Sequence, residues 1–273
     1  MRAVKEWRHI SYEQLPCFDN MAIDEYLIKY YEKTKRPVLR FYGWSPAAIS
    51  VGKYQSVIND INIEACTDDD MCVVRRITGG GGILHEDELT YSIVCSEEDI
   101  GCRNMEVKKA FEKLNGFILN FYRGYGLKPA YAVEVLKKTV FGGAAPFCYT
   151  GHEEYDIVVK GKKIGGNAQM RKKNIIFQHG SIPLSGAKEK PLKYFNAGIN
   201  TEGFTTLCAE AKKHIEPAEA SLRLLDVFKA TFKVKVKEEK FLEKEKEAVD
   251  RLVIEKYSSD EWNLKGGKDA LRA

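Results

Sequence analysis

Four consecutive glycines lie in the stretch Arg75-Arg76-Ile77-Thr78-Gly79-Gly80-Gly81-Gly82-Ile83-Leu84-His85. Glycine has no Cβ atom, so this loop can turn tightly, adopt positive φ angles and approach a ligand closely. Residues 71–74 before it and 89–94 after it have the composition of β-strands. A glycine loop between two strands is typical of a pocket at the edge of a sheet, although a flexible surface turn has the same composition.

Two common phosphate-binding motifs do not fit the glycine loop. No Gly-Lys-Ser/Thr follows the glycines, which excludes a P-loop. A strand follows rather than a helix, which excludes a dinucleotide-binding fingerprint. The flanking Arg75, Arg76 and His85 nevertheless suit a site that holds an anionic or phosphate-bearing group.

The composition is that of a globular protein. The 273 residues are 44% hydrophobic and 30% charged, enough for one domain with a full core. The net charge of +4 is too small to indicate nucleic-acid binding. We expect no membrane association, because no apolar run is long enough to cross a membrane and the N-terminus lacks the apolar core of a signal peptide. Seven scattered cysteines without a CxxC pair predict a reducing cytoplasm and no structural zinc site.

The residue pattern predicts an α+β fold, with mixed, curved sheets flanked by helices rather than regular βαβ units. The predicted helices are 20–33, 61–66, 107–121, 222–232 and 241–252. The predicted strands are 38–44, 48–52, 71–74, 89–94, 155–159, 163–169 and 174–181. We interpret residues 1–215 as a catalytic domain and residues 216–273 as a small helical extension packed on it.

Cys148 and Lys163 are the candidates for chemistry. Cys148 lies in an irregular segment, and its thiolate could attack an acyl donor if a nearby cation favoured that form. Lys163 follows a hairpin turn and precedes Gly165-Gly166-Asn167-Ala168, small residues that let a ligand pass close to the backbone. Inert burial of Cys148 and a solvated turn position for Lys163 are the alternatives. His152 could pair with Cys148.

The chain contains three motifs in order: Arg75-Arg76-x-Thr78-Gly79-Gly80-Gly81 with His85, then Lys163-x-x-Gly166-x-Ala168, then His179-Gly180-Ser181. Together they resemble the lipoate–protein ligase, octanoyltransferase and biotin ligase superfamily. Residues 40–46, 85–92 and 256–263 resemble its branch of monomeric cysteine octanoyltransferases. The nucleophile of that branch lies in a Cys-x6-Tyr-acidic pattern, which Cys148…Tyr155-Asp156 matches. The resemblance extends over residues 7–263.

The resemblance implies a biotinyl/lipoyl protein ligase-like catalytic domain that moves octanoyl from acyl carrier protein to a lipoyl-domain lysine. Cys148 would carry the acyl group, Lys163 would be the second catalytic residue, and no metal or cofactor is expected. The acceptors would be the glycine-cleavage H protein and the acyltransferase subunits of 2-oxoacid dehydrogenases. The residues expected to contact the substrate are Arg76, Thr78, Gly79, Gly80, Gly81, His85, Gly165, Gly166, Asn167, Ala168, His179 and Gly180.

Three positions depart from the octanoyltransferase pattern. Gly81-Gly82 replaces a common Arg-Ala pair, Asn167 replaces a usual Ser, and residues 151–154 lack the usual Pro-Ser. An ATP-dependent lipoate–protein ligase therefore stays open, in which Arg76 and the glycine loop would hold the adenylate phosphate with Mg-ATP as cofactor. Further alternatives are an amidotransferase that takes octanoyl from the H protein and an inactive member that binds lipoyl domains.

Two basic segments could steer an acidic carrier protein toward the site. They are Arg171-Lys172-Lys173 and Lys160-Gly161-Lys162. A solvated charge run is the alternative for both.

Overall fold

The computed structural model describes residues 6–103, 105–136, 147–149, 153–187, 189–196 and 199–266. Within them, eight strands form one large sheet and three form a small one. From edge to edge, the large sheet contains β11 (Lys235–Glu238), β1 (Glu6–Leu15), β2 (Val38–Trp44), β6 (Glu88–Cys95), β10 (Ile175–Pro183), β9 (Lys162–Lys172), β8 (Ile157–Val159) and β7 (Pro129–Tyr131). The small sheet contains β4 (Cys72–Arg75), β3 (Ala48–Val51) and β5 (Ile83–His85).

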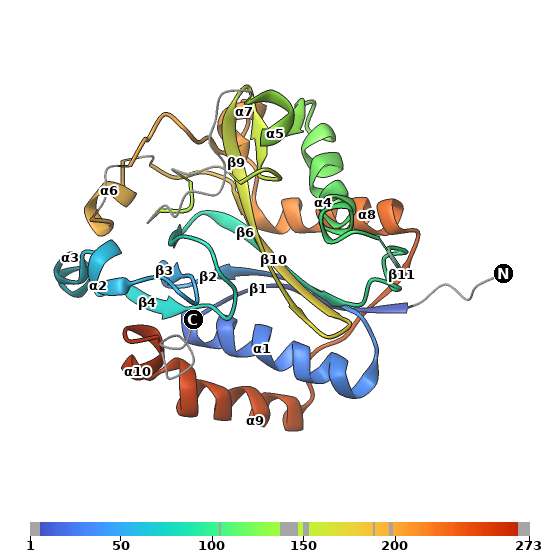
Figure 1. Ribbon diagram of the computed structural model, residues 1–273, viewed down its shortest axis with the longest axis horizontal. Coiled ribbons are helices and arrows are strands. Elements are labelled where there is room, and N and C mark those ends of the chain that lie inside the picture. Colours follow the sequence, from blue (N-terminus) through green and yellow to red (C-terminus); the bar gives the residue numbers. More distant parts are fainter. Residues whose placement is uncertain are drawn as a thin grey trace.

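Helices cover both faces of the large sheet (Figure 1). Helices α1 (Cys17–Thr34) and α9 (Glu243–Leu252) lie on one face, and α4 (Val107–Arg123) and α8 (Pro217–Phe232) on the other. The shorter helices are α2 (Val57–Asp60), α3 (Ile63–Asp68), α5 (Ala132–Val135), α6 (Pro191–Tyr194), α7 (Leu207–Ala211), the π-helix η1 (Val253–Tyr257) and α10 (Asp260–Asn263). Since the large sheet mixes parallel and antiparallel pairs, the predicted α+β class with mixed sheets is confirmed.

Strand β1 is an element that the sequence pattern did not predict. It lies between two parallel neighbours, β11 and β2. Its residues 7–10 are all buried but include the polar Arg8 and His9. The segment therefore shows neither the alternation of a half-exposed strand nor the apolar run of a strand buried on both faces. The prediction that residues 129–150 are irregular is also wrong in part, because β7 and α5 occupy 129–135.

The C-terminal segment contains a strand as well as the predicted helices. Helix α8 packs on α4, β11 joins the large sheet beside β1, and α9 packs on α1 across the sheet. The segment thus wraps around one sheet edge and touches both helical layers (Figure 1). The predicted C-terminal helices are present, β11 is a strand that the pattern did not predict, and the division into two domains near residue 215 stays a prediction.

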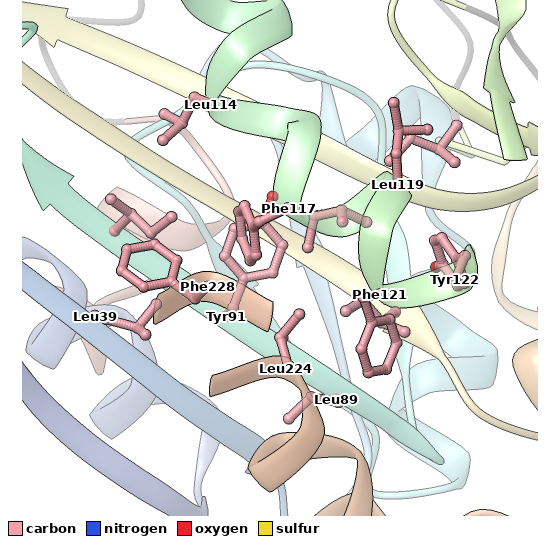
Figure 2. Packing of buried hydrophobic residues seen from close by; sticks show 14 of the residues in the cluster. Leu39, Leu89, Tyr91, Leu114, Phe117, Leu119, Phe121, Tyr122, Leu224 and Phe228 are labelled. Carbon is pink, nitrogen blue, oxygen red and sulfur yellow. The ribbon is translucent and has the colours of Figure 1, made fainter. Parts of the chain in front are cut away.

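The main hydrophobic core lies between the sheet and the α4–α8 pair (Figure 2). Phe117 of α4 is at its centre, with edge-to-face contacts to Tyr91 of β6 at 5.2 Å and to Phe228 of α8 at 5.3 Å between ring centroids. Phe228 in turn contacts Trp7 of β1 at 4.9 Å. Each such pair contributes roughly 0.5–1.5 kcal/mol beyond the area it buries, so these rings tie β1, β6 and both helices together.

The opposite face of β6 is buried but polar. Leu89, Tyr91 and Ile93 point toward α4 and α8, so the alternating Glu88, Thr90 and Ser92 point toward α1. A strand buried on both faces normally carries apolar residues on both. The polar residues of this face therefore need hydrogen-bond partners inside the protein.

A β-bulge in the β8–β9 hairpin reorients Lys163. Ile157 pairs with Gly165 and Val158 pairs with Lys163, so β9 has one extra residue at this point. Lys163 and Gly166 are three residues apart, and strict alternation would place them on opposite faces. The bulge brings the Lys163 side chain to the face of Gly166.

The burial of His9 in β1 should make the free energy of unfolding depend on pH. Neither ring nitrogen has a hydrogen-bond partner among the described residues, and burial lowers the pKa of His9 to about 4. The unfolded chain, with a histidine pKa near 6.5, then binds the extra proton first, so folding becomes less favourable as pH falls from 6.5 toward 4. We expect the free energy of unfolding to fall by about 2 kcal/mol more between pH 7 and 5 in the wild type than in His9→Leu.

Urea unfolding of both proteins at several pH values measures this difference. His214→Gln is the control, because His214 is exposed and lies beside Glu216. Equal slopes for the wild type and His9→Leu would contradict the assignment.

Candidate active site

A pocket lies on the α1-facing side of the large sheet, where the glycine loop meets it. Residues of β2, β6, β9 and β10 line it together with the loop, and it encloses about 710 Å³ of space with its open mouth included. The predicted site residues in its lining are Arg76, Gly79, Gly80, Gly81, His85, Cys148, Lys163, Gly166, Asn167, Ala168, His179 and Gly180. Thr78 and Gly165 lie outside the lining.

The glycine loop lies directly on the end of β3. Gly80 has a φ of +95°, a conformation that disfavours other residues. A Cβ atom built on Gly52 would lie 1.9 Å from the carbonyl oxygen of Gly80, so Gly52 must also be glycine for the loop to pack here. Sequence reasoning assigned no role to Gly52, although it is the last residue of a predicted strand.

Arg76 holds the loop from inside. Its guanidinium donates to the Ser50 carbonyl at 2.9 Å and to the Ser50 hydroxyl at 2.8 Å. It also donates to the carbonyls of Gly79 at 3.1 Å and Gly81 at 3.0 Å. Burial lowers the pKa of Arg76 to about 10. Both terminal nitrogens are thus already bound to protein, and Arg76 shapes the loop while its charge lies beside the pocket.

Arg75 points away from the pocket, which corrects the expectation that the arginine pair holds an anion. Its guanidinium donates to the carbonyls of Gly52, Gln55 and Trp262, at 2.8, 2.8 and 2.9 Å. The Trp262 indole donates back to the Arg75 carbonyl at 3.0 Å. Arg75 therefore fastens the C-terminal α10 to β4.

Cys148 sits at the junction of the loop and β9. Its backbone N–H donates to the Gly82 carbonyl at 2.8 Å, which pairs residue 147 with the end of the glycine loop. A Cβ atom built on Gly166 would lie 3.2 Å from the Cys148 sulfur, so the missing side chain at Gly166 leaves room for the thiol. His152, the predicted partner of Cys148, lies outside the described residues.

Lys163 forms a buried charge cluster with Cys148 and Asp156. Its Nζ atom is 2.6 Å from Asp156 Oδ2, 2.7 Å from the Cys148 carbonyl oxygen and 3.7 Å from the Cys148 sulfur. Burial alone would lower the pKa of Lys163, but Cys148 and Asp156 outweigh it and raise the pKa above its ordinary value. Lys163 is only 2% exposed and carries its positive charge next to the thiol. The alternative of a solvated turn lysine is wrong.

The neighbours of Gly166 face the other side of the sheet. The Asn167 side chain accepts a hydrogen bond from the Tyr91 hydroxyl at 2.6 Å, on the α4-facing side. Cβ atoms built on Gly165 and Gly180 would meet Tyr122 and Asn167 respectively, on that same side. Asn167 and Gly180 therefore offer the pocket only their backbone, and Gly165 gives space to the core.

The predicted histidines support the pocket walls. His179 is bound to the Thr78 hydroxyl at 2.7 Å and lies 3.4 Å from Asp24. Burial lowers the pKa of His179, although Asp24 acts against it. His85 lies between the Ser50 hydroxyl at 2.6 Å and the Glu88 carboxylate at 2.7 Å.

A hydrogen-bonded chain through Glu88 connects the glycine loop to the segment of Cys148. Besides His85, Glu88 accepts from Thr90 and from the Ser181 hydroxyl, and Tyr149 donates to Ser181 at 3.0 Å. Burial acts to raise the pKa of Glu88, but these partners lower it below its ordinary value. The carboxylate is thus held ionised between the two halves of the site.

Sequence reasoning gave no role to several residues that shape the site. Asp156 appeared only as the acidic position of a motif. Tyr42 and Trp44 appeared only within a predicted strand and the resembling stretch 40–46, and Met21 only within a predicted helix. The alternation of β6 could have suggested Glu88, because Thr90 and Ser92, at the next alternate positions of the strand, are also polar.

The described residues contain no group of three or more histidine, cysteine or acidic side chains arranged to hold a metal ion. Within the same part of the chain, none of the helices combines the length and apolarity needed to cross a membrane.

Comparisons with known proteins agree on one protein family. The profile of the lipoyl protein ligase A/B catalytic domain matches residues 16–229. The chain belongs to this family, as its motifs predicted. It is 35% identical over 274 residues to the octanoyltransferase LipM of Bacillus subtilis (strain 168), covering 95% of this chain and 98% of that protein. It is 33% identical over 277 residues to the octanoyltransferase LipM of Geobacillus kaustophilus (strain HTA426), covering 96% and 99%.

Solved structures of lipoate protein ligases have the same fold. Lipoate-protein ligase A bound with ATP superimposes with a TM-score of 0.79 at 21% identity, covering 95% of this chain and 98% of that one. A structure from a study of a bipartite lipoate protein ligase and its E2 lipoyl domain from Thermoplasma acidophilum superimposes with a TM-score of 0.77 at 20% identity, covering 96% of each chain. At this identity the likeness establishes the fold.

The ion pair between Lys163 and Asp156 predicts a pH effect in this family member. Asp156→Asn removes a cause of the raised pKa of Lys163, so burial is less opposed and the pKa falls. The charge of Lys163 is expected to promote reaction at Cys148. The rate of Cys148 acylation by a soluble thioester should then begin to fall at alkaline pH about one pH unit or more earlier in Asp156→Asn than in the wild type. A pH–rate profile measures the shift.

Glu153→Gln is the matched control, because Glu153 is another acidic residue in the pocket lining. We expect it to move the alkaline limb much less. An unchanged profile in Asp156→Asn would show that Asp156 does not govern the Lys163 charge.

Proposed function

We propose that this protein moves an octanoyl group from acyl carrier protein to a lipoyl-domain lysine through a thioester on Cys148. The observation that carries the proposal is the position of the Cys148 thiol, 3.7 Å from the buried Lys163 ammonium at the wall of a pocket. The near-full-length similarity to octanoyltransferases supports octanoyl as the group transferred and lipoate biosynthesis as the setting. We place the reaction in the cytoplasm, where thiols stay reduced.

In the first step, the Cys148 thiolate attacks the carbonyl carbon of the octanoyl thioester. A new carbon–sulfur bond forms, the bond to the carrier's sulfur breaks, and the carrier thiolate leaves and takes up a proton. The Lys163 ammonium stabilises negative charge on the sulfur before attack. Backbone N–H groups of β9 near Lys163 are candidates to stabilise the oxyanion of the tetrahedral intermediate.

In the second step, the neutral amine of the acceptor lysine attacks the acyl-enzyme. A carbon–nitrogen bond forms, the bond to Cys148 breaks, and the proton lost by the amine neutralises the released thiolate. The sequence of thioester, thioester and amide runs downhill without ATP. We therefore propose that the reaction needs no cofactor.

In the ligase alternative, Arg76 would have to bind a phosphate. Its two terminal nitrogens already make four hydrogen bonds to Ser50 and the glycine loop. An adenylate phosphate would have to replace some of these bonds, which supports the transferase over the ligase. We propose acyl carrier protein rather than the H protein as the donor, and the test below separates the two.

The acceptor is a lipoyl-domain protein, in keeping with the family. We propose the glycine-cleavage H protein and the 2-oxoacid dehydrogenase acyltransferase subunits as its members. One structural relative is described together with its own E2 lipoyl domain as a lipoylation system, which supports such a partner here.

The transferase proposal predicts a covalent intermediate. Incubation with octanoyl-acyl carrier protein, without lipoyl domain, should add one octanoyl group that neutral hydroxylamine removes. Cys148→Ala should abolish both the adduct and the transfer, and Lys163→Ala should slow acylation by about 10²-fold or more because the cation beside the thiol is lost. Intact-protein mass spectrometry measures the adduct.

Cys208→Ala is the matched control, since Cys208 is a partly buried thiol outside the pocket lining. Octanoyl-H protein as donor and free octanoate with Mg-ATP are tested in parallel. Substantial transfer by Cys148→Ala, or activity only with free acid and ATP, would overturn the proposal.

The two basic segments lie at opposite ends of β9. Lys172 is nine residues from Lys163, about 30 Å along an extended strand. It pairs with Glu32 at 2.8 Å, and Arg171 pairs with Glu97 at 2.6 Å. Lys160 and Lys162 lie within three residues of Lys163, so only their turn is near the reacting thiol.

We expect Lys160→Glu with Lys162→Glu to raise the KM for the carrier protein several-fold at low salt, because charge steering acts near the site and is screened by salt. Lys172→Glu with Lys173→Glu carries the same charge change and should leave the KM unaltered. Steady-state kinetics at two salt concentrations compares them, and the reverse pattern would place docking at the far end of the hairpin.

A further inference from the structure

The pocket has a long axis that the strand register defines. Tyr42 of β2 pairs with Thr90 of β6, Thr90 with Ser181 of β10, and Ser181 with Gly166 of β9. All four line the pocket. Three strand spacings separate the outer two, about 14 Å. Because the Cys148 thiol lies over Gly166, the Tyr42 end is the far end of the pocket from the thiol.

Two walls of the far end are fixed by polar contacts. The Tyr42 hydroxyl donates to Asp24 at 2.9 Å, and the Arg40 guanidinium lies 3.9 Å from the Tyr42 ring centroid. The Trp44 indole donates to Thr90 at 2.8 Å and stacks on His85 at 3.8 Å. Neither ring can move without breaking a buried hydrogen bond.

Met21 of α1 is the third wall at this end, and its side chain has no such constraint. It packs in the same cluster as Tyr42 and Trp44 and is 2% exposed. Its backbone is positioned through the preceding residue, since the Asn20 amide donates to the Gly43 carbonyl at 2.9 Å and accepts from Arg40 at 2.6 Å. A flexible thioether on a fixed backbone is the adjustable part of the far wall.

The length of the pocket suits a medium acyl chain. An extended eight-carbon chain spans roughly 9 Å, given single bonds near 1.5 Å and bond angles near 111°. The rest of the 14 Å backbone-to-backbone span is occupied by the side chains at the two ends. An acyl chain on Cys148 would therefore place its last carbons against the far wall.

We propose that Met21 sets the upper limit on the length of the acyl chain that this protein accepts. The proposal rests on the proposed acyl transfer through Cys148 and adds the residue that selects among acyl chains. Shortening Met21 should admit longer chains, and enlarging it should exclude octanoyl in favour of shorter ones.

The test uses the full chain and carrier proteins loaded with hexanoyl, octanoyl, decanoyl or dodecanoyl groups, offered in pairs. Mass spectrometry of the acyl-enzyme gives the ratio of the two adducts at early times. For Met21→Ala we expect the decanoyl-to-octanoyl ratio to rise about tenfold or more, since one or two methylenes in an apolar pocket discriminate to that extent. Met21→Phe should raise the hexanoyl-to-octanoyl ratio by a similar factor.

Met170→Ala is the matched control. Met170 is partly buried against the same cluster but does not line the pocket, so its loss removes the same atoms without lengthening the pocket. Its ratios should equal those of the wild type. Met21→Val is made as well, because it leaves a smaller cavity than alanine and keeps the experiment informative if Met21→Ala unfolds.

The outcomes separate the two proposals. Adducts with unchanged ratios in the folded Met21 variants would overturn the role of Met21 and leave acyl transfer intact. No adduct with any chain length in the wild type would overturn acyl transfer itself. Ratios that shift equally in Met170→Ala would assign the effect to loosened packing and overturn the role of Met21.

Discussion

Two buried carboxylates, Asp24 and Glu88, organise the face of the sheet on which the pocket is built. Asp24 accepts hydrogen bonds from Arg40 at 3.0 Å, Tyr42 at 2.9 Å and Ser92 at 2.8 Å. Burial acts to raise the pKa of Asp24, but its partners lower it below the ordinary value. Burial of an ion in a protein costs several kcal/mol unless hydrogen bonds compensate, so strands β2, β6 and β10 must meet α1 in one register.

The same constraint gives the pocket rigid walls. Asp24 binds the hydroxyl of Tyr42 and so fixes its ring. Glu88 binds Thr90 and His85, and these two residues hold the Trp44 indole. The glycine loop is bound to this face through Arg76 and Ser50. A second charge pair, Lys163 with Asp156, lies at the other end. The acyl-binding part of the pocket and the reacting part are therefore positioned by separate buried ion clusters.

The C-terminal segment supports the site from outside. Strand β11 completes the sheet beside β1, and α10 is fastened to β4 through Arg75, the residue next to the loop-shaping Arg76. The Asn263 side chain also accepts from the Arg75 backbone N–H at 3.0 Å. Adjacent arginines thus have different tasks, because Arg76 continues the pairing of β4 with β3 for one residue and successive side chains on an extended backbone point to opposite sides.

The sequence by itself determined the elements with a clear period and the residues whose chemistry is tied to a motif. Helix α4 and the β8–β9 hairpin have regular patterns, and the glycine loop, Cys148 and Lys163 stand in recognisable spacings. Family membership followed from those spacings and is confirmed. Local composition is sufficient in these cases, because turns, helix periods and glycine requirements depend on neighbouring residues.

Only the tertiary structure decided which side chains share the pocket. Strand β1 escaped prediction because the buried Arg8 and His9 interrupt its apolar pattern and their contacts lie elsewhere in the fold. Asn167 was assigned to the substrate although its side chain faces Tyr91. A one-residue bulge in β9 decides the orientation of Lys163, and a bulge is set by pairing with another strand. Contacts such as Lys163 with Asp156 depend on register between segments, which no single stretch of sequence contains.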